Sequence, residues 1–164
     1  MSSVLVSPSG ALIQVMGRQG QLRQNPNAAQ VVLAGAALIV LSSPLIQLER
    51  GQGVLAFGSA SGASAGAAGV LTAAIQATVP PALPVVLQAA SDDAGAGASA
   101  RPRMLMAAFI PANVNVPSQV QIDLTVAAAA QNFDVGAQPL GGCSLLWQVV
   151  ELQDLSFTLI TASP

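Results

Sequence analysis

The residues of this sequence that could do chemistry are seven carboxylates and one cysteine, because the chain contains no His, no Lys and no Tyr. Without His there is no Ser-His-Asp triad and no imidazole ligand for a metal. Without Lys there is no phosphate-binding P-loop and no Schiff base. Cys143 has no base to activate it, and a single cysteine forms no intrachain disulfide. We expect Cys143 to be a small buried residue at the start of a strand.

The acidic residues show no spacing that is typical of a site. A glycosidase needs two carboxylates about one substrate, and a calcium site needs several oxygen ligands. None of the acids lies in the Asp-x-Asn/Asp-x-Gly pattern of a calcium loop, and a turn with Asx side chains explains the one adjacent pair. The sequence therefore predicts no enzyme, no metal site and no cofactor. The acids considered are Asp92, Asp93, Asp123, Asp134, Glu151 and Asp154.

Nucleic acid and small molecules are also poor candidates for partners. Five Arg in a chain of net charge -2 cannot form a face that neutralises phosphates. Aromatic residues make only 3% of the chain, which leaves few platforms for stacked bases. We expect no nucleic-acid partner and no small-molecule substrate.

The shortage of charge indicates a surface that other subunits cover. Only 7% of the residues are charged, whereas about a quarter are charged in a typical globular protein. An isolated domain of this length exposes roughly 7,500 Å², which five basic and seven acidic side chains cannot cover. Such a chain is poorly protected against association. A GC-rich genome is the alternative explanation, but it accounts for the missing Lys and not for the scarce Arg, Asp and Glu.

The clearest periodic segment is residues 119–126, where apolar and polar side chains alternate. Side chains of a strand point alternately to opposite faces, so this pattern predicts a strand with one face in a core. The other face carries Gln119, Gln121, Asp123 and Thr125, of which only one is charged. Such a face tolerates water and loses little when another polar surface covers it. We expect it to be a subunit contact.

Short apolar runs separated by Gly and Pro predict strands along the rest of the chain. No long amphipathic helix is visible, so the fold class is all-β, an antiparallel β-sandwich or a jelly roll. Residues 45–49 and 54–57 form the pattern of a hairpin around Gly51. The other predicted strands are residues 4–6, 11–15, 104–110, 119–126, 145–152 and 155–160.

Long loops rich in Gly, Ser and Ala are expected to connect the strands. Residues 58–69 hold four Gly and three Ser, a composition typical of flexible segments. Residues 91–103 form a second such loop and carry the densest charge of the chain. Both are expected on the surface.

The first 30 residues are expected to form an N-terminal arm or a short hairpin, and residues 31–164 a single β domain. No acid precedes Glu49, so the Gln-rich segment 17–27 is the only clearly basic one. Arg18 and Arg23 lie in it. It is either a solvated loop or an arm that lies on an acidic partner.

An apolar run that begins at Val31 and ends at Leu41 requires a test for membrane insertion. A spanning helix needs about 20 apolar residues, and this run ends after eleven at Ser42-Ser43-Pro44. Its length suits a buried strand or a core helix better. We expect no membrane partner, and a membrane-associated protein is only the weakest of the functional hypotheses.

The first functional hypothesis is a structural virion protein. It is a cement or decoration protein of a tailed phage that binds the capsid surface as a homo-oligomer, such as a trimer. Its partners are its own copies and a major capsid protein, and residues 58–69 are its exposed tip. The residues expected to contact partners are Arg18, Arg23, Gln119, Gln121 and Asp123.

The second hypothesis is an extracellular or fibre-type β module that binds carbohydrate or a cell-surface partner. It would use the loops at residues 91–103 and 136–142, with Trp147 as a stacking platform. A single Trp in an apolar strand is more often a core residue, and we expect that placement for Trp147.

Overall fold

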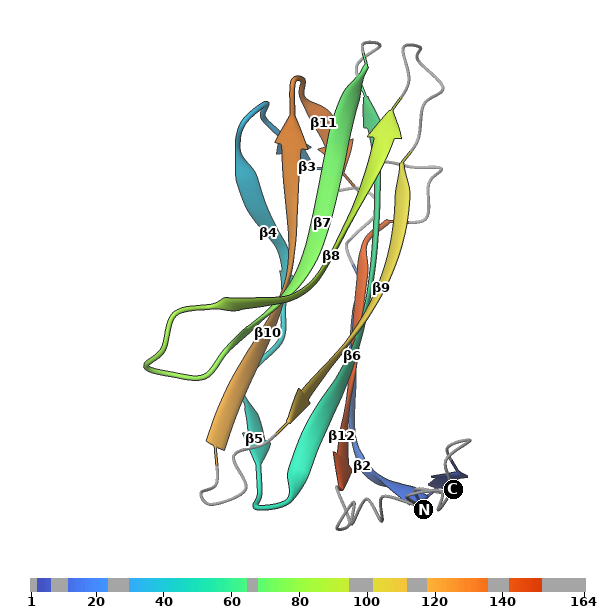
Figure 1. Cartoon of the computed structure of the whole chain (residues 1–164), viewed down its shortest axis with the longest axis vertical. Coiled ribbons are helices and arrows are strands. Elements are labelled where there is room, and N and C mark those ends of the chain that lie inside the picture. Colours follow the sequence, from blue (N-terminus) through green and yellow to red (C-terminus); the bar gives the residue numbers. More distant parts are fainter. Residues whose placement is uncertain are drawn as a thin grey trace, which may run out of the picture.

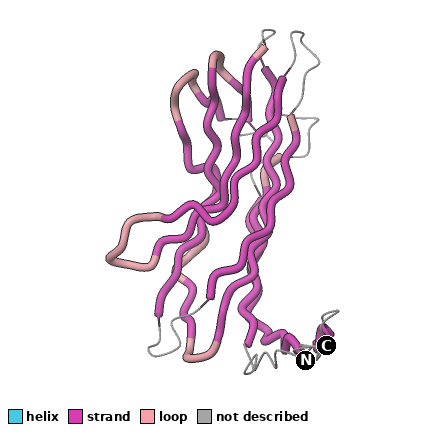
Figure 2. The backbone as a smooth tube through the Cα atoms, in the orientation of Figure 1, coloured by secondary structure: helices cyan, strands magenta, loops and turns pink. Residues whose placement is uncertain are grey.

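The described part of the chain consists of strands that form two antiparallel sheets packed face to face (Figures 1 and 2). It contains no helix, and so none with the length and apolar character that crossing a bilayer requires. The predicted antiparallel sandwich is confirmed. The computed structural model describes residues 3–6, 12–23, 30–64, 68–94, 102–111, 118–135 and 142–151.

The seven-stranded sheet is built around its longest strand, β6. One edge of β6 pairs with β12 and then with β11, and the other edge pairs with β9. Beyond β12 lie β2 and β1, and beyond β11 lies β3. The strands are β1 (Ser3–Val6), β2 (Leu12–Arg23), β3 (Gln30–Val32), β6 (Gln52–Ser64), β9 (Arg103–Pro111), β11 (Phe133–Val135) and β12 (Ser144–Glu151).

The five-stranded sheet is built around β10, the strand that alternation predicts most clearly. Its residues Val120, Ile122, Leu124 and Val126 are buried, so the predicted core face is confirmed. One edge of β10 pairs with β7, which pairs with β8, and the other edge pairs with β4 and β5. The strands are β4 (Ala37–Ser42), β5 (Ile46–Leu48), β7 (Gly69–Thr78), β8 (Val85–Ala94) and β10 (Ser118–Ala129).

The predicted loop and exposed tip at residues 58–69 is wrong for residues 58–64, which form the second half of β6. Gly62 faces Leu71 of the opposite sheet, and a Cβ at Gly62 would lie 2.8 Å from the Leu71 Cδ2 atom. The small residues of β6 therefore let the two sheets approach closely. They show no hydrophobic alternation, and for that reason composition alone indicates a loop.

The predicted hairpin of residues 45–49 and 54–57 is also wrong. β5 pairs with β10 in the five-stranded sheet, whereas β6 lies in the seven-stranded sheet. The chain crosses between the sheets at Gly51, which has a positive φ of 76°. Ile46 and Leu48 are buried, and this alternation would be the same in either sheet.

Two other predicted loops are partly strand. Residues 17–23, expected in a loop or an arm, continue β2 and pair with β12, while the predicted hairpin of β1 and β2 is confirmed. In the second loop, residues 91–94 complete β8. The Arg103 backbone N–H donates to the Asp92 carboxylate at 3.1 Å, which links the edges of β8 and β9.

The apolar run from Val31 to Leu41 is divided between the two sheets. It begins in β3, turns at Gly35 with a φ of 77°, and ends in β4. The run is therefore strand at both ends, but the expectation of one buried strand or a core helix is wrong, because the run forms two strands and Val31, Leu33 and Ile39 are more than half exposed.

Ser43 fills the gap between β4 and β5, which pair with the same edge of β10. The Ser43 N–H donates to the Ile122 carbonyl oxygen at 2.8 Å, and the Ile122 N–H donates to Ser43 Oγ at 2.9 Å. The hydroxyl thus takes the place of a backbone partner for a fully buried residue.

Ser43→Ala is expected to lower the free energy of unfolding by about 1–3 kcal/mol, because it leaves the buried Ile122 N–H without an acceptor. Urea denaturation measures this. Ser59→Ala is the control, since the half-buried Ser59 hydroxyl bonds only to the Ser144 hydroxyl, at 2.7 Å. An equal loss in both variants would show that the Ser43 hydroxyl has no special role.

Candidate interaction surfaces

The five predicted contact residues do not form one surface. Gln119, Gln121 and Asp123 lie on the outward face of β10, in the five-stranded sheet. Arg23 ends β2 in the seven-stranded sheet, where it is exposed. The outward faces of the two sheets of a sandwich point in opposite directions. The side chain of Arg18 lies outside the described part of the chain.

The outward face of β10 carries a short hydrogen-bonded network. The Gln121 side-chain amide donates to Ser42 Oγ at 2.7 Å, and the Ser42 hydroxyl donates to the Asp123 carboxylate at 2.5 Å. Asp123 is only 7% exposed, whereas Gln119 is exposed and Gln121 half-buried. Asp123 therefore orients its neighbours, and the two Gln are the residues of this face that a partner could touch.

The same face continues across β7 and β8 as an uncharged surface that mixes polar side chains with apolar ones, such as Val86 beside Gln76. Thr125 Oγ1 donates to the Ala74 carbonyl oxygen at 3.3 Å, and the hydroxyls of Thr72 and Ser91 lie 2.8 Å apart. Gln76 pairs with Asp123 in the β7–β10 register. Among the side chains that the structure describes in the middle of this face, Asp123 is the one charge, and it is buried.

The opposite face of the molecule carries a surface that sequence analysis missed. Four large apolar side chains point outward from the middle of the seven-stranded sheet, each 41% to 86% exposed. They are contiguous, because Phe57 pairs with Leu146 of β12 on one side and with Ala107 of β9 on the other. We call this set the outer patch. Its members are Phe57, Leu105, Phe109 and Leu146.

The sequence of β9 held the signal that would have revealed the outer patch. Met104, Met106 and Ile110 point into the core, yet Leu105 and Phe109 on the other parity are also apolar. A strand that is apolar on both faces is typical of a strand covered on both faces. In the described part of the chain, the fold covers one face of β9 and leaves Leu105 and Phe109 exposed on the other.

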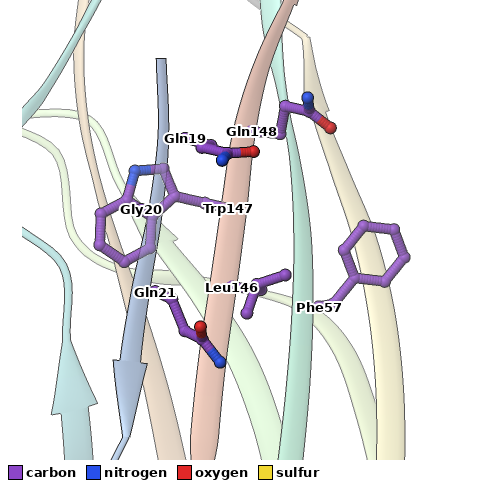
Figure 3. Close-up of a pocket in the computed structure, with 7 residues that line it drawn as sticks. All are labelled: Gln19, Gly20, Gln21, Phe57, Leu146, Trp147 and Gln148. Atoms are coloured by element: carbon purple, nitrogen blue, oxygen red, sulfur yellow. The ribbon is translucent and has the colours of Figure 1, made fainter. Parts of the chain in front are cut away.

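A shallow pocket of about 250 Å³ opens beside the outer patch (Figure 3). Phe57 and Leu146 line it together with three neutral amides, and Gly20 and Trp147 complete it. Trp147 is 9% exposed and packs in the core, as predicted, so it offers no open face for stacking. The amides are those of Gln19, Gln21 and Gln148.

In the described part of the chain, the charged side chains of this outward face surround the outer patch and do not enter it. Arg103 pairs with Ser61 and Asp134 with Ala63, both beyond the outer patch. Arg23 pairs with Ser144 beside the patch, in the row of Leu105. An apolar centre with polar and charged residues at its edge is the usual anatomy of a protein interface.

The groups that could do chemistry form no site in the described part of the chain. No three of its His, Cys, Asp and Glu side chains are grouped so that they could hold a metal ion. Cys143 is buried directly before β12, as predicted, and burial raises the pKa of its thiol. The thiol is therefore neutral at neutral pH.

Comparisons with known proteins show similarity to solved structures, two of which are described below. No protein-family model matches the chain, and no curated protein matches it. A chain in the structure of infectious bursal disease virus Gx strain is similar with a TM-score of 0.48 and 10% identity, over 94% of this chain and 42% of that one. A chain in the structure of the Gt strain gives 0.44 and 13%, over 92% and 46%. This chain thus spans less than half of either.

Proposed function

We propose that this chain is a structural protein of a virus particle, a cement or decoration protein that binds the shell of a tailed phage as a homo-oligomer. The outer patch is the observation that carries the proposal. Four large apolar side chains are exposed together on a chain in which 7% of the residues are charged. Contiguous apolar patches on soluble proteins typically mark sites of interaction with other proteins or with membranes.

The two outward faces suit two kinds of contact. The outer patch is apolar and suits contact between copies of the chain, because burying apolar area drives association. The face of β10 is polar but neutral, and Gln119 and Gln121 can exchange water for hydrogen bonds to a shell protein without the desolvation of a charge. An oligomer that touches several shell subunits at once gains avidity without new contacts.

A mechanical role rather than a catalytic one is part of the proposal. The Cys143 thiol is buried and neutral, and the Asp123 carboxylate is held by Ser42 inside the hydrogen-bonded network of β10. These two groups contribute to the fold and have no open access to a substrate.

Carbohydrate binding by an extracellular module is the second candidate. The pocket beside the outer patch favours it, since Phe57 and three Gln side chains are residue types that bind sugars through stacking and hydrogen bonds. Binding on a glycan array that Phe57→Ala abolishes would support this candidate over the first.

The expected result for the proposed function is that the chain sediments with virus particles and that its native mass is a multiple of 16.3 kDa. Gln121→Lys should reduce the number of copies on the particles about tenfold, because an unpaired charge buried in the contact costs more than about 1.4 kcal/mol. Its free energy of unfolding should change by less than about 1 kcal/mol, because the lysine ammonium can replace the Gln121 amide as the donor to Ser42 Oγ.

Gln88→Lys provides the matched control, because Gln88 is exposed on β8, two strands away from β10. It should sediment like the wild type. A chain that is a stable monomer and remains with the soluble protein when particles are pelleted would contradict the proposed function.

A further inference from the structure

The hairpin of β7 and β8 ends in a second exposed apolar surface. It projects from the sandwich on the side away from the seven-stranded sheet (Figures 1 and 2). Four of its apolar side chains are 43% to 84% exposed, and no charged residue occurs between Arg50 and Asp92. We call this set the hairpin tip. Its members are Val79, Leu83, Val85 and Val86.

One hydrogen bond and three prolines restrict the backbone conformation of the hairpin tip. The Ala82 N–H donates to the Val79 carbonyl oxygen at 2.8 Å, which closes the turn. Pro80, Pro81 and Pro84 fix three backbone φ angles within five residues. A segment that is already ordered loses less conformational entropy when it binds.

The hairpin tip and the outer patch match in size and character. A fully exposed aromatic side chain presents about 200 Å² and a Val or Leu side chain less. With the exposed fractions of its four side chains, each surface offers on the order of 400 Å² of apolar area. None of the eight side chains is charged or polar. The outer patch also adjoins a pocket of about 250 Å³, and the hairpin tip presents Leu83, which is 84% exposed.

We propose that the hairpin tip of one copy packs on the outer patch of the next copy, so that copies of the chain associate head to tail. This inference rests on the proposed function, which requires a homo-oligomer, and it names the surfaces that form it. One kind of contact then covers both apolar surfaces of every copy. Two outer patches placed against each other would leave every hairpin tip exposed.

The geometry excludes closure within one molecule. The hairpin tip projects away from the seven-stranded sheet, whose outward face carries the outer patch, so a chain cannot cover its own patch (Figure 1). Each contact buries roughly 400 Å² on either copy, about 800 Å² in total, which is half of an interface of standard size and corresponds to a weak contact. A ring compensates for this, because every copy makes two such contacts. Head-to-tail contacts of this kind form rings when the rotation closes.

The test uses two variants that each remove one side of the contact. Leu83→Asp disables the hairpin tip and Leu105→Asp disables the outer patch, and both residues are more than 80% exposed, so the domain should fold. Each variant alone should be monomeric by native mass spectrometry. An equimolar mixture should form a 1:1 heterodimer, because one intact tip and one intact patch remain.

The control is Leu45→Asp, at a half-exposed leucine that belongs to neither surface. It should keep the wild-type oligomer. An intermolecular disulfide between Leu83→Cys and Leu146→Cys, which Leu45→Cys cannot replace, should form in the otherwise unchanged chain. This readout does not depend on how well the Asp variants fold, and the buried Cys143 does not compete.

Three outcomes would overturn the head-to-tail contact. These are an oligomer of wild-type mass for Leu83→Asp alone, a mixture without heterodimer, and loss of particle binding by Leu105→Asp with its oligomer intact. The last would assign the outer patch to the shell protein. If one of these outcomes occurs and the wild-type chain sediments with particles, the proposed function stands without this contact. A head-to-tail oligomer that never sediments with particles would refute the function alone.

Discussion

Gly20→Ala is expected to lower the free energy of unfolding by about 3 kcal/mol, at the upper end of the range for overpacking. A Cβ at Gly20 would overlap the indole ring of Trp147, which extends from the neighbouring strand β12 over β2 at Gly20 (Figure 3). The ring is rigid and 9% exposed, so it must leave its site rather than bend. Since the chain has one Trp, urea denaturation and a red shift of its fluorescence both report the change.

The sign of the stability change in Gly20→Ala shows whether the Trp147 indole lies against Gly20. Gly in the interior of a strand costs about 0.5–1 kcal/mol relative to Ala, so Gly20→Ala would stabilise β2 if nothing lay against it. Gln21→Ala, next to it on the outward face, is the control and should change stability by less than about 0.5 kcal/mol. A stabilised Gly20→Ala variant with unshifted emission would show that the indole does not occupy this place.

Leu71→Ala and Gly62→Ala are expected to be destabilising singly and to compensate each other in the double variant. Leu71 is fully buried, and its truncation should cost about 2–5 kcal/mol through the cavity that it leaves. A Cβ at Gly62 lies 2.8 Å from Leu71 Cδ2, so Gly62→Ala should cost about 1–3 kcal/mol. In the double variant the new methyl group occupies part of the cavity.

A double-mutant cycle measures this compensation by urea denaturation. The loss in the double variant should fall short of the sum of the single losses by at least about 0.5 kcal/mol, as for residues in contact. Leu71→Ala with Ala107→Gly is the control pair, because Ala107 is exposed on β9 and should add independently. Strict additivity for Gly62 and Leu71 would place Gly62 outside the core, as the loop prediction did.

How far the fold could be predicted depended on the size of the side chains. The alternation of Val120, Ile122 and Leu124 with polar residues predicted β10 and its buried face, and both are confirmed. In the second half of β6, burial alternates along the strand, but the inward residues are Gly, Ala and Ser, whose small apolar area leaves no hydrophobic alternation in the sequence. The pairing of the strands was harder to predict than their positions. Ile46 and Leu48 of β5, for example, would be buried in either sheet.

The sequence predicted that the chain has interaction surfaces, but it did not predict which residues form them. The low charge indicated covered surface, and the structure has an exposed apolar patch and a neutral polar face. Arg23 and Gln121 were grouped from local composition, yet the register of β2 and β10 places them in different sheets. The outer patch joins Phe57, Leu105 and Leu146, which are neighbours only through strand pairing. A linear pattern does not contain that information.

The charge-free stretch between Arg50 and Asp92 has a consequence for the conditions under which the chain assembles. It supplies the hairpin tip and part of the outer patch, so the contact proposed between copies involves no ion pair. Dissolved salt screens the attraction between charges, so it does not weaken a contact that contains none. Cooling does weaken it, because apolar association loses strength at low temperature. Temperature rather than ionic strength is the variable that would loosen an assembly of this kind.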